Sequence, residues 1–170
     1  LGAHVISGDA LGHEAYLPGT KGFGQVVGAF GEKIVGDDGF VDRKKLGPIV
    51  FSDPANLDLL NSIMHPIIYE MIKDRIKDVS GVPLVVVEAA VLIEANWKDL
   101  FDEIWVVTSA QEIVISRLAA RNNLNRNDAI ARIQSQMPQD ERITHAHVEI
   151  DNSGTILDLE KAVKDIWNNK

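Results

Sequence analysis

Two acidic residues follow apolar runs of the chain, where they could serve phosphoryl transfer or hold a metal ion. Asp9 comes after residues 4–8, and Glu88 comes directly after the apolar residues 84–87. In a parallel α/β sheet the active-site crevice opens outside the carboxyl ends of the strands. Two acids at such ends therefore indicate phosphoryl or metal chemistry.

Each acid also has a purely structural explanation. An Asp just past a strand more often caps a helix or forms a turn; the catalytic alternative makes Asp9 a base that accepts or orients the proton of an attacking hydroxyl. Glu88 ends a run of β-branched residues that predicts burial, and a buried carboxylate needs neutralisation or a cation. A magnesium-bound water fits Glu88, and an ion pair with an arginine or a capped helix end fits equally well.

Basic residues form a second group. Arg117 and Arg121 are four residues apart and share a face of a predicted helix, and Arg142 follows a segment that bears Arg126 and Arg132. Such a face could clamp phosphates through bidentate hydrogen bonds. More often arginines of this kind are solvated or paired with acids, here Glu112 and Asp128.

The histidines and glycines give weaker signals. His13 and His65 have no spacing typical of a metal site, and His145 with His147 would make a two-histidine zinc site that lacks a third ligand. No Gly-x-x-x-x-Gly-Lys-Ser/Thr motif, which would cradle nucleotide phosphates, occurs in the 170 residues.

The elements that must position these residues alternate along the chain. Short runs rich in Val and Ile predict strands near residues 3–7, 84–90, 103–108 and 147–150. Helical patterns occupy residues 22–30, a segment from Asp42, residues 55–79, 110–121, 125–137 and 156–167. Asp42 and Asn125 are candidate N-caps of two of these helices. We expect Pro66 to start a second helix or to kink one. This alternation predicts a parallel sheet with crossover helices.

Composition narrows the class of protein further. The 170 residues, 45% of them hydrophobic, are enough for one compact domain. A net charge of −8 argues against a broad nucleic-acid or anionic-membrane surface. The chain has no cysteine, which excludes disulfides and thiolate metal sites and fits a reducing compartment. No apolar run approaches the ~18 residues of a membrane span.

Several short motifs, taken in order, carry a family resemblance. They are Ser7-Gly8-Asp9, Leu11-Gly12-His13-Glu14, Gly39 with Arg43, Ile63-Met64-His65-Pro66, Glu88-Ala89-Ala90 with Glu94, Arg117 with Arg121, Ile133-Gln134-Ser135-Gln136-Met137, and Asp151-Asn152. Their order and spacing over nearly the whole chain resemble the dephospho-CoA kinase family, and more closely the kinase half of the animal bifunctional CoA synthase.

The resemblance implies a P-loop-kinase-like, three-layer α/β/α fold with a parallel sheet. It implies transfer of the ATP γ-phosphate to the ribose 3′-hydroxyl of dephospho-CoA with Mg²⁺, as the last step of CoA synthesis. By resemblance Asp9 is the catalytic base and Glu88 serves the magnesium through water. The implied acceptor-binding residues are His13, Arg43, His65 and Glu94, and the implied ATP-binding residues are Arg117, Arg121, Arg142 and Asn152.

Two departures from the family pattern shape the expectations. Ser7 stands where the family has an aspartate, and the first strand with its phosphate loop is expected to be absent, so residues 1–170 are interpreted as one N-terminally truncated domain. An inserted helical acceptor and lid region would span about residues 18–80. We expect negligible turnover from these residues alone, and a fused upstream adenylyltransferase domain in a longer protein.

Two alternatives stay open. The chain could be another small-molecule or nucleotide kinase of the same fold. It could also be a non-catalytic fragment that binds the acceptor or has a regulatory role. The expected partners are ATP and dephospho-CoA, with no nucleic acid and no membrane span. The expected location is the cytoplasm or the mitochondrion.

Overall fold

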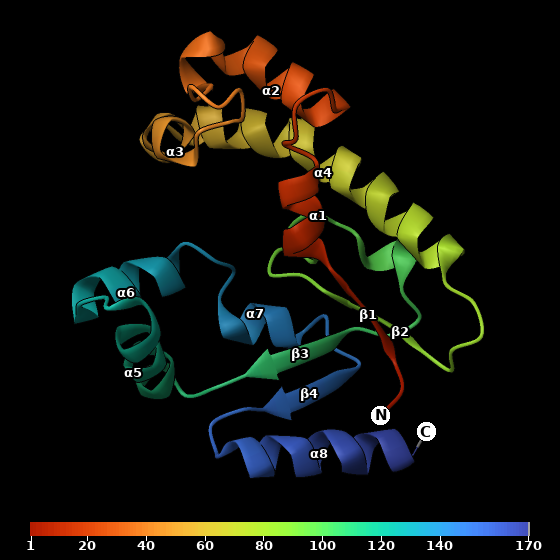
Figure 1. Cartoon of the computed structure of the whole chain (residues 1–170). Helices are drawn as coiled ribbons and strands as arrows, with labels where there is room; N and C mark the ends of the chain where they lie inside the picture. The colour runs from red at the N-terminus through yellow and green to blue at the C-terminus, as the bar shows by residue number, and fades with distance from the viewer. Residues whose placement is uncertain (170) are drawn as a thin grey trace. The chain divides into compact units, whose positions relative to one another are not determined.

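The computed structural model describes residues 1–169, which form short parallel strands joined by helices (Figure 1). The chain divides into two compact units, Gly2–Ala95 and Asn96–Lys170, the second of which also takes Leu1. Each unit contains one pair of parallel strands. The predicted parallel α/β character is thus confirmed, and the three-layer arrangement stays a prediction.

The unit Gly2–Ala95 is built on strands β1 (His4–Ser7) and β2 (Val85–Glu88). They run parallel in a register that pairs His4 with Val85 and Ser7 with Glu88. The connection between them carries α1 (Gly8–Glu14), α2 (Lys21–Phe30), the 3₁₀ turn η1 (Glu32–Ile34), α3 (Arg43–Phe51) and α4 (Pro54–Asp78). The first three of these α-helices each pack against α4.

Side-chain caps begin all four helices of this unit. Each cap accepts a hydrogen bond from a backbone N–H of the first turn, which would otherwise lack a partner. The capping residues are Ser7, Thr20, Asp42 and Asp53. The predicted cap at Asp42 is confirmed. Beyond the caps, the helices meet in an apolar core of Ala15, Val26, Phe30, Ile34, Leu46, Val50 and Met64.

Helix α4 passes through Pro66 without stopping. No second helix begins at Pro66, although the missing proline N–H removes one backbone hydrogen bond. Met64 and Ile72 lie on either side of it and are 4% and 0% exposed. Burial of both side chains stabilises the helix across the proline.

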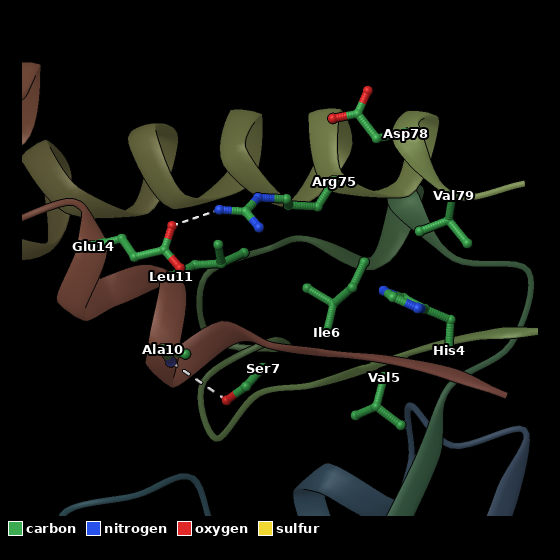
Figure 2. A pocket seen from close by; sticks show the side chains of 10 residues that line it. All are labelled: His4, Val5, Ile6, Ser7, Ala10, Leu11, Glu14, Arg75, Asp78 and Val79. Atoms are coloured by element: carbon green, nitrogen blue, oxygen red, sulfur yellow. Dashed lines mark hydrogen bonds and ion pairs between the residues drawn. The ribbon is translucent and has the colours of Figure 1, made fainter.

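The burial predicted for strand β2 is only half correct. Val85 and Val87 are half-buried, whereas Val86 and Glu88 are exposed. Side chains alternate between the two faces of a strand, and in this unit the helices cover one face. Figure 2 shows Ile6 of the paired strand directed toward α4 and Val5 directed away from it, and these residues are 6% and 63% exposed.

The second unit is built on strands β3 (Trp105–Thr108) and β4 (Val148–Asp151). They are parallel, with Trp105 opposite Val148 and Thr108 opposite Asp151. The other elements are η2 (Lys98–Leu100), α5 (Gln111–Asn122), α6 (Arg126–Gln134), α7 (Gln139–Ile143) and α8 (Ile156–Asn168). Helix α5 packs with α6, α7 with β3 and α8 with β4.

The predicted helices of this second unit are present, with differences at their ends. Asn125 caps α6 as expected, and α6 ends at Gln134 rather than near Met137. Helix α7, which follows Pro138, was not predicted because five residues are too few to show a helical period. Among residues 1–169, no helix is both long enough and apolar enough to cross a membrane.

Candidate functional site

The ends of β1 and β2 bring Ser7 and Glu88 together. The Ser7 hydroxyl donates to Glu88 Oε2 over 3.3 Å and accepts the N–H of Ala10 over 3.4 Å. Asp9 lies one residue into α1, where its carboxylate is exposed and lacks a hydrogen-bond partner within residues 1–169. A carboxylate that has no hydrogen-bond partner and lies next to a strand end is available to a substrate hydroxyl.

Few acidic or histidine side chains lie near one another around these residues. No group of three or more His, Asp or Glu side chains close enough to hold an ion occurs in the described part of the chain. Magnesium commonly takes only one or two carboxylates and completes its shell with water and substrate phosphates. Glu88 therefore fits a water-rich magnesium site, which stays a prediction. The alternative ion pair of Glu88 with an arginine does not occur among the described side chains.

The predicted acceptor residues are only partly gathered. His65 is half-buried on α4 and interacts electrostatically with Glu94. Burial lowers the pKa of His65, and the nearby Glu94 carboxylate acts in the opposite direction. His13 on α1 and Arg43 at the start of α3 are exposed, and neither side chain bonds to another described residue.

A cavity of about 640 Å³ lies in the second unit, and we call it the arginine cavity. Its lining includes all four predicted ATP-binding residues, Arg117, Arg121, Arg142 and Asn152. Helix α5 presents Arg117 and Arg121 from successive turns, whereas Arg142 comes from α7 and Asn152 follows β4. Segments that are distant in the sequence thus meet at one cavity.

The arginines of this region have different partners. Arg117 donates from Nη1 to the Asn152 carbonyl over 2.6 Å and from Nη2 to the Gly154 carbonyl over 3.0 Å. Arg142 Nε is buried and has no partner in the described part of the chain. Arg126, by contrast, forms a bidentate pair with Glu112 at 2.6 and 2.7 Å. The structural explanation of paired arginines therefore holds for Arg126.

Sequence reasoning missed three polar residues of the arginine cavity, Thr108, Ser109 and Gln139. The backbone N–H of Ser109 donates to Gln139 Oε1 over 3.1 Å, and the Ser109 hydroxyl donates to the Asn152 carbonyl over 3.3 Å. Ser109 directly follows β3, as Gly8 and Asp9 follow β1, so the rule on strand ends could have found it. Gln139 carries no such signal in the sequence.

His145 and His147 are occupied by structural contacts. His147 Nδ1 accepts the N–H of Ile104 over 3.0 Å, and His145 Nδ1 lies 3.3 Å from Lys98 Nζ. The zinc interpretation gains no support, because Nδ1 of each imidazole already contacts a neighbouring residue.

A second cavity, of about 410 Å³, lies between β1, α1 and the end of α4 (Figure 2). Its charged side chains neutralise each other in part, since Arg75 Nη2 lies 2.7 Å from Glu14 Oε2. None of the predicted site residues lines it.

Comparison with known proteins identifies the family. A family model described as dephospho-CoA kinase matches residues 1–158. A dephospho-CoA kinase of Geobacter sulfurreducens is 43% identical over 169 residues, which cover 98% of this chain and 86% of that protein. The chain belongs to the dephospho-CoA kinase family. Another dephospho-CoA kinase, from Carboxydothermus hydrogenoformans, is 42% identical over 92% of this chain and 77% of its own.

Solved structures agree with this family. The crystal structure of TT1252 from Thermus thermophilus superimposes with a TM-score of 0.80 at 30% identity, over 99% of this chain and 85% of that one. Dephospho-CoA kinase from Campylobacter jejuni gives a TM-score of 0.69 at 25% identity, with the same coverage of both chains. The likeness extends over nearly the whole chain.

Membership in the dephospho-CoA kinase family confirms that the protein is an enzyme, a phosphotransferase of the kinase class. The narrower likeness to an animal bifunctional synthase is not shown, because the relatives named above are bacterial. The match covers 86% of the Geobacter sulfurreducens protein, which leaves no room there for a fused adenylyltransferase. The comparisons give no support to the expected loss of turnover. The roles of individual residues, the domain boundaries and the compartment stay predictions.

Proposed function

We propose that the protein transfers the γ-phosphate of ATP to the ribose 3′-hydroxyl of dephospho-CoA, giving CoA and ADP. Its family supports the reaction class. The observation that carries the nucleotide part of the proposal is the lining of the arginine cavity by Arg117, Arg121, Arg142 and Asn152. A cluster of cations with a neutral amide suits a polyphosphate that carries a base.

In the proposed reaction, the Asp9 carboxylate accepts the proton of the 3′-hydroxyl as its oxygen bonds to the γ-phosphorus. The bond from that phosphorus to the oxygen bridging it to the β-phosphate breaks, and ADP leaves with the bridging oxygen. Asp9 suits this role because it is exposed and unpaired among the described residues. His65 and Glu94 would hold the acceptor, because they lie close to each other and His65 belongs to the predicted acceptor region.

On the nucleotide side, Arg142 has the strongest reason to bind phosphate. Its Nε is buried with no partner within residues 1–169, and a buried donor left without an acceptor is costly. A phosphate oxygen in the arginine cavity would satisfy it. Mg²⁺, when bound, would offset phosphate charge, with Glu88 holding one of its water ligands and Ser7 orienting that carboxylate.

The first test is ADP release from ATP in the presence of magnesium and dephospho-CoA. We expect ADP formation that depends on dephospho-CoA and falls ~100-fold or more in Asp9→Asn, because the amide is no base. Asp58→Asn is the matched control: it makes the same change at an exposed carboxylate on α4 and should leave the rate unchanged.

Titration calorimetry with each ligand separates the alternatives. Saturable binding of dephospho-CoA without ADP formation would replace the proposal with a non-catalytic binding module. ADP formation with AMP as acceptor, at a rate above that with dephospho-CoA, would replace it with another nucleotide kinase of this fold.

A further inference from the structure

The orientation of the Gln139 amide is determined by its neighbour. Ser109 donates its backbone N–H to Gln139 Oε1 over 3.1 Å. A backbone N–H can only donate, so the atom that faces it must be the amide oxygen and not the amide nitrogen. The amide nitrogen, Nε2, is thereby left with two hydrogens, and Gln139 is among the residues that line the arginine cavity.

Gln139 Nε2 has no acceptor among residues 1–169, whereas the nearby hydroxyl protons are already used. Thr108 Oγ1 donates to Glu149 Oε1 over 2.9 Å, and Ser109 Oγ donates to the Asn152 carbonyl over 3.3 Å. Gln139 therefore offers the cavity a neutral hydrogen-bond donor whose direction is already set. A donor held in place in this way loses little freedom when it binds a ligand.

The composition of the cavity suggests which part of a nucleotide meets this donor. Arg117, Arg121 and Arg142 supply the positive charge that phosphates require. The remaining lining includes the apolar side chains of Val114 and Leu118 together with neutral amides. Apolar walls with a few oriented polar groups are typical of sites for aromatic ligands such as a nucleobase.

We propose that Gln139 Nε2 donates a hydrogen bond to N1 of adenine and thereby makes the enzyme prefer ATP over GTP. This inference rests on the proposed function, since it requires the phosphoryl donor to occupy the arginine cavity. N1 of adenine is an acceptor, whereas N1 of guanine carries a hydrogen and would face the amide donor with another donor. Two donors that face each other with no acceptor between them reduce the free energy of binding.

The test compares ATP and GTP affinity by titration calorimetry in the unmodified protein and two variants. Gln139→Glu keeps an oxygen for the Ser109 N–H but loses the donor, and Gln139→Met loses both functions at similar size. We expect ATP to bind at least ~10-fold more tightly than GTP, and both variants to weaken ATP ~10-fold. Gln139→Met should remove the preference, whereas Gln139→Glu should shift it toward GTP, because a carboxylate oxygen can accept the N1–H of guanine. Gln25→Glu, an exposed site on α2, is the control for added charge and should change nothing.

A nucleotide analogue tests the same hydrogen bond in the unmodified protein. 1-Deaza-ATP has a carbon in place of N1, so the unmodified protein should bind it ~10-fold more weakly than ATP. In Gln139→Met the loss on going from ATP to the analogue should vanish, because the two changes remove the same hydrogen bond.

The outcomes are distinguishable. If the unmodified protein does not bind ATP, the nucleotide site of the proposed function fails and this inference with it. If ATP binds but 1-deaza-ATP binds as tightly, or the variants keep the preference for ATP, the role of Gln139 alone is overturned. Melting temperatures of the variants show whether they fold, and the analogue arm decides the question if they do not.

Discussion

At the scale of single residues, the partner of a side chain determines what it can do. Arg126 is paired with Glu112, and that pairing lowers the pKa of the Glu112 carboxyl. Arg142 differs because its Nε is buried without a partner in the described part of the chain. These two residues of the same type, sixteen positions apart in the sequence, therefore differ: Arg126 is held in a structural pair, whereas Arg142 keeps an unsatisfied buried donor.

Tyr16 gives a prediction at alkaline pH. It packs against the core of the first unit, and burial raises its pKa from 10.0 to about 12. The folded state thus favours the neutral phenol, so its stabilising contribution is complete below about pH 10 and is lost as pH rises toward 12. We expect Tyr16→Phe to lose less unfolding free energy than the unmodified protein between neutral pH and pH ~11, by about 1–2 kcal/mol. Denaturant titration measures this difference, and equal losses in both proteins would contradict it.

His65 gives a prediction at acidic pH. Burial lowers its pKa below the ordinary 6.5, so the folded state favours the neutral imidazole. Stability should therefore be lost as pH falls below about 6.5 and through the folded-state pKa. In His65→Gln this part of the acid sensitivity should be absent. Denaturant titrations at a series of pH values provide the measurement. If stability depends on pH equally in His65→Gln and in the unmodified protein, His65 is not the source of this acid sensitivity.

At the scale of elements, helix starts are determined locally, whereas close packing depends on neighbours. Thr20 both caps α2 and donates its hydroxyl proton to the Ala15 carbonyl over 2.7 Å. This contact holds the start of α2 against the turn after α1. Gly22, the second residue of α2, faces the same Ala15 carbonyl, with no room between them for a side chain.

Two glycines of α2 make a matched pair of substitutions. A Cβ at Gly22 would clash with the Ala15 carbonyl oxygen, whereas one at Gly24 would meet nothing within 4 Å. We expect Gly22→Ala to destabilise the protein by about 1–3 kcal/mol, and Gly24→Ala to stabilise it by about 0.5–1 kcal/mol because alanine favours helix. Thermal unfolding of both variants checks the prediction. Similar effects in the two would show that α2 does not pack tightly on Ala15.

At the scale of the whole molecule, the predicted roles divide between the two units. Asp9, Glu88 and the His65–Glu94 pair belong to Gly2–Ala95, and the arginine cavity belongs to Asn96–Lys170. In the proposed function the first unit would bind the phosphate acceptor and the second the phosphate donor.

Hydrogen exchange tests which unit binds which substrate. We expect ATP to slow amide exchange mainly in the segments 107–121 and 139–152, which contain the residues that line the arginine cavity. Dephospho-CoA should slow it mainly around Asp9 and His65. Mass spectrometry of peptides from each unit provides the measurement. Protection by ATP confined to Gly2–Ala95 would contradict the nucleotide site.

The sequence alone determined much of the local structure and the family. Strand positions were predicted to within a few residues, and the caps at Asp42 and Asn125 were correct, because caps and periodicity depend on residues three or four apart. Motif order was sufficient to indicate the dephospho-CoA kinase family. The expectation of a second helix starting at Pro66 was wrong, because α4 continues through the proline and buries Met64 and Ile72; the alternative of a kink stays a prediction.

Only the tertiary structure decided which side chains are free to act. The sequence presented Arg117, Arg126 and Arg142 alike, and their partners became clear only when α5, α6, α7 and the end of β4 were in place. It was equally silent on Gln139, whose significance depends on a hydrogen bond to Ser109 thirty residues earlier. Contacts between distant segments depend on how the whole chain packs, and neither spacing nor composition encodes them one residue at a time.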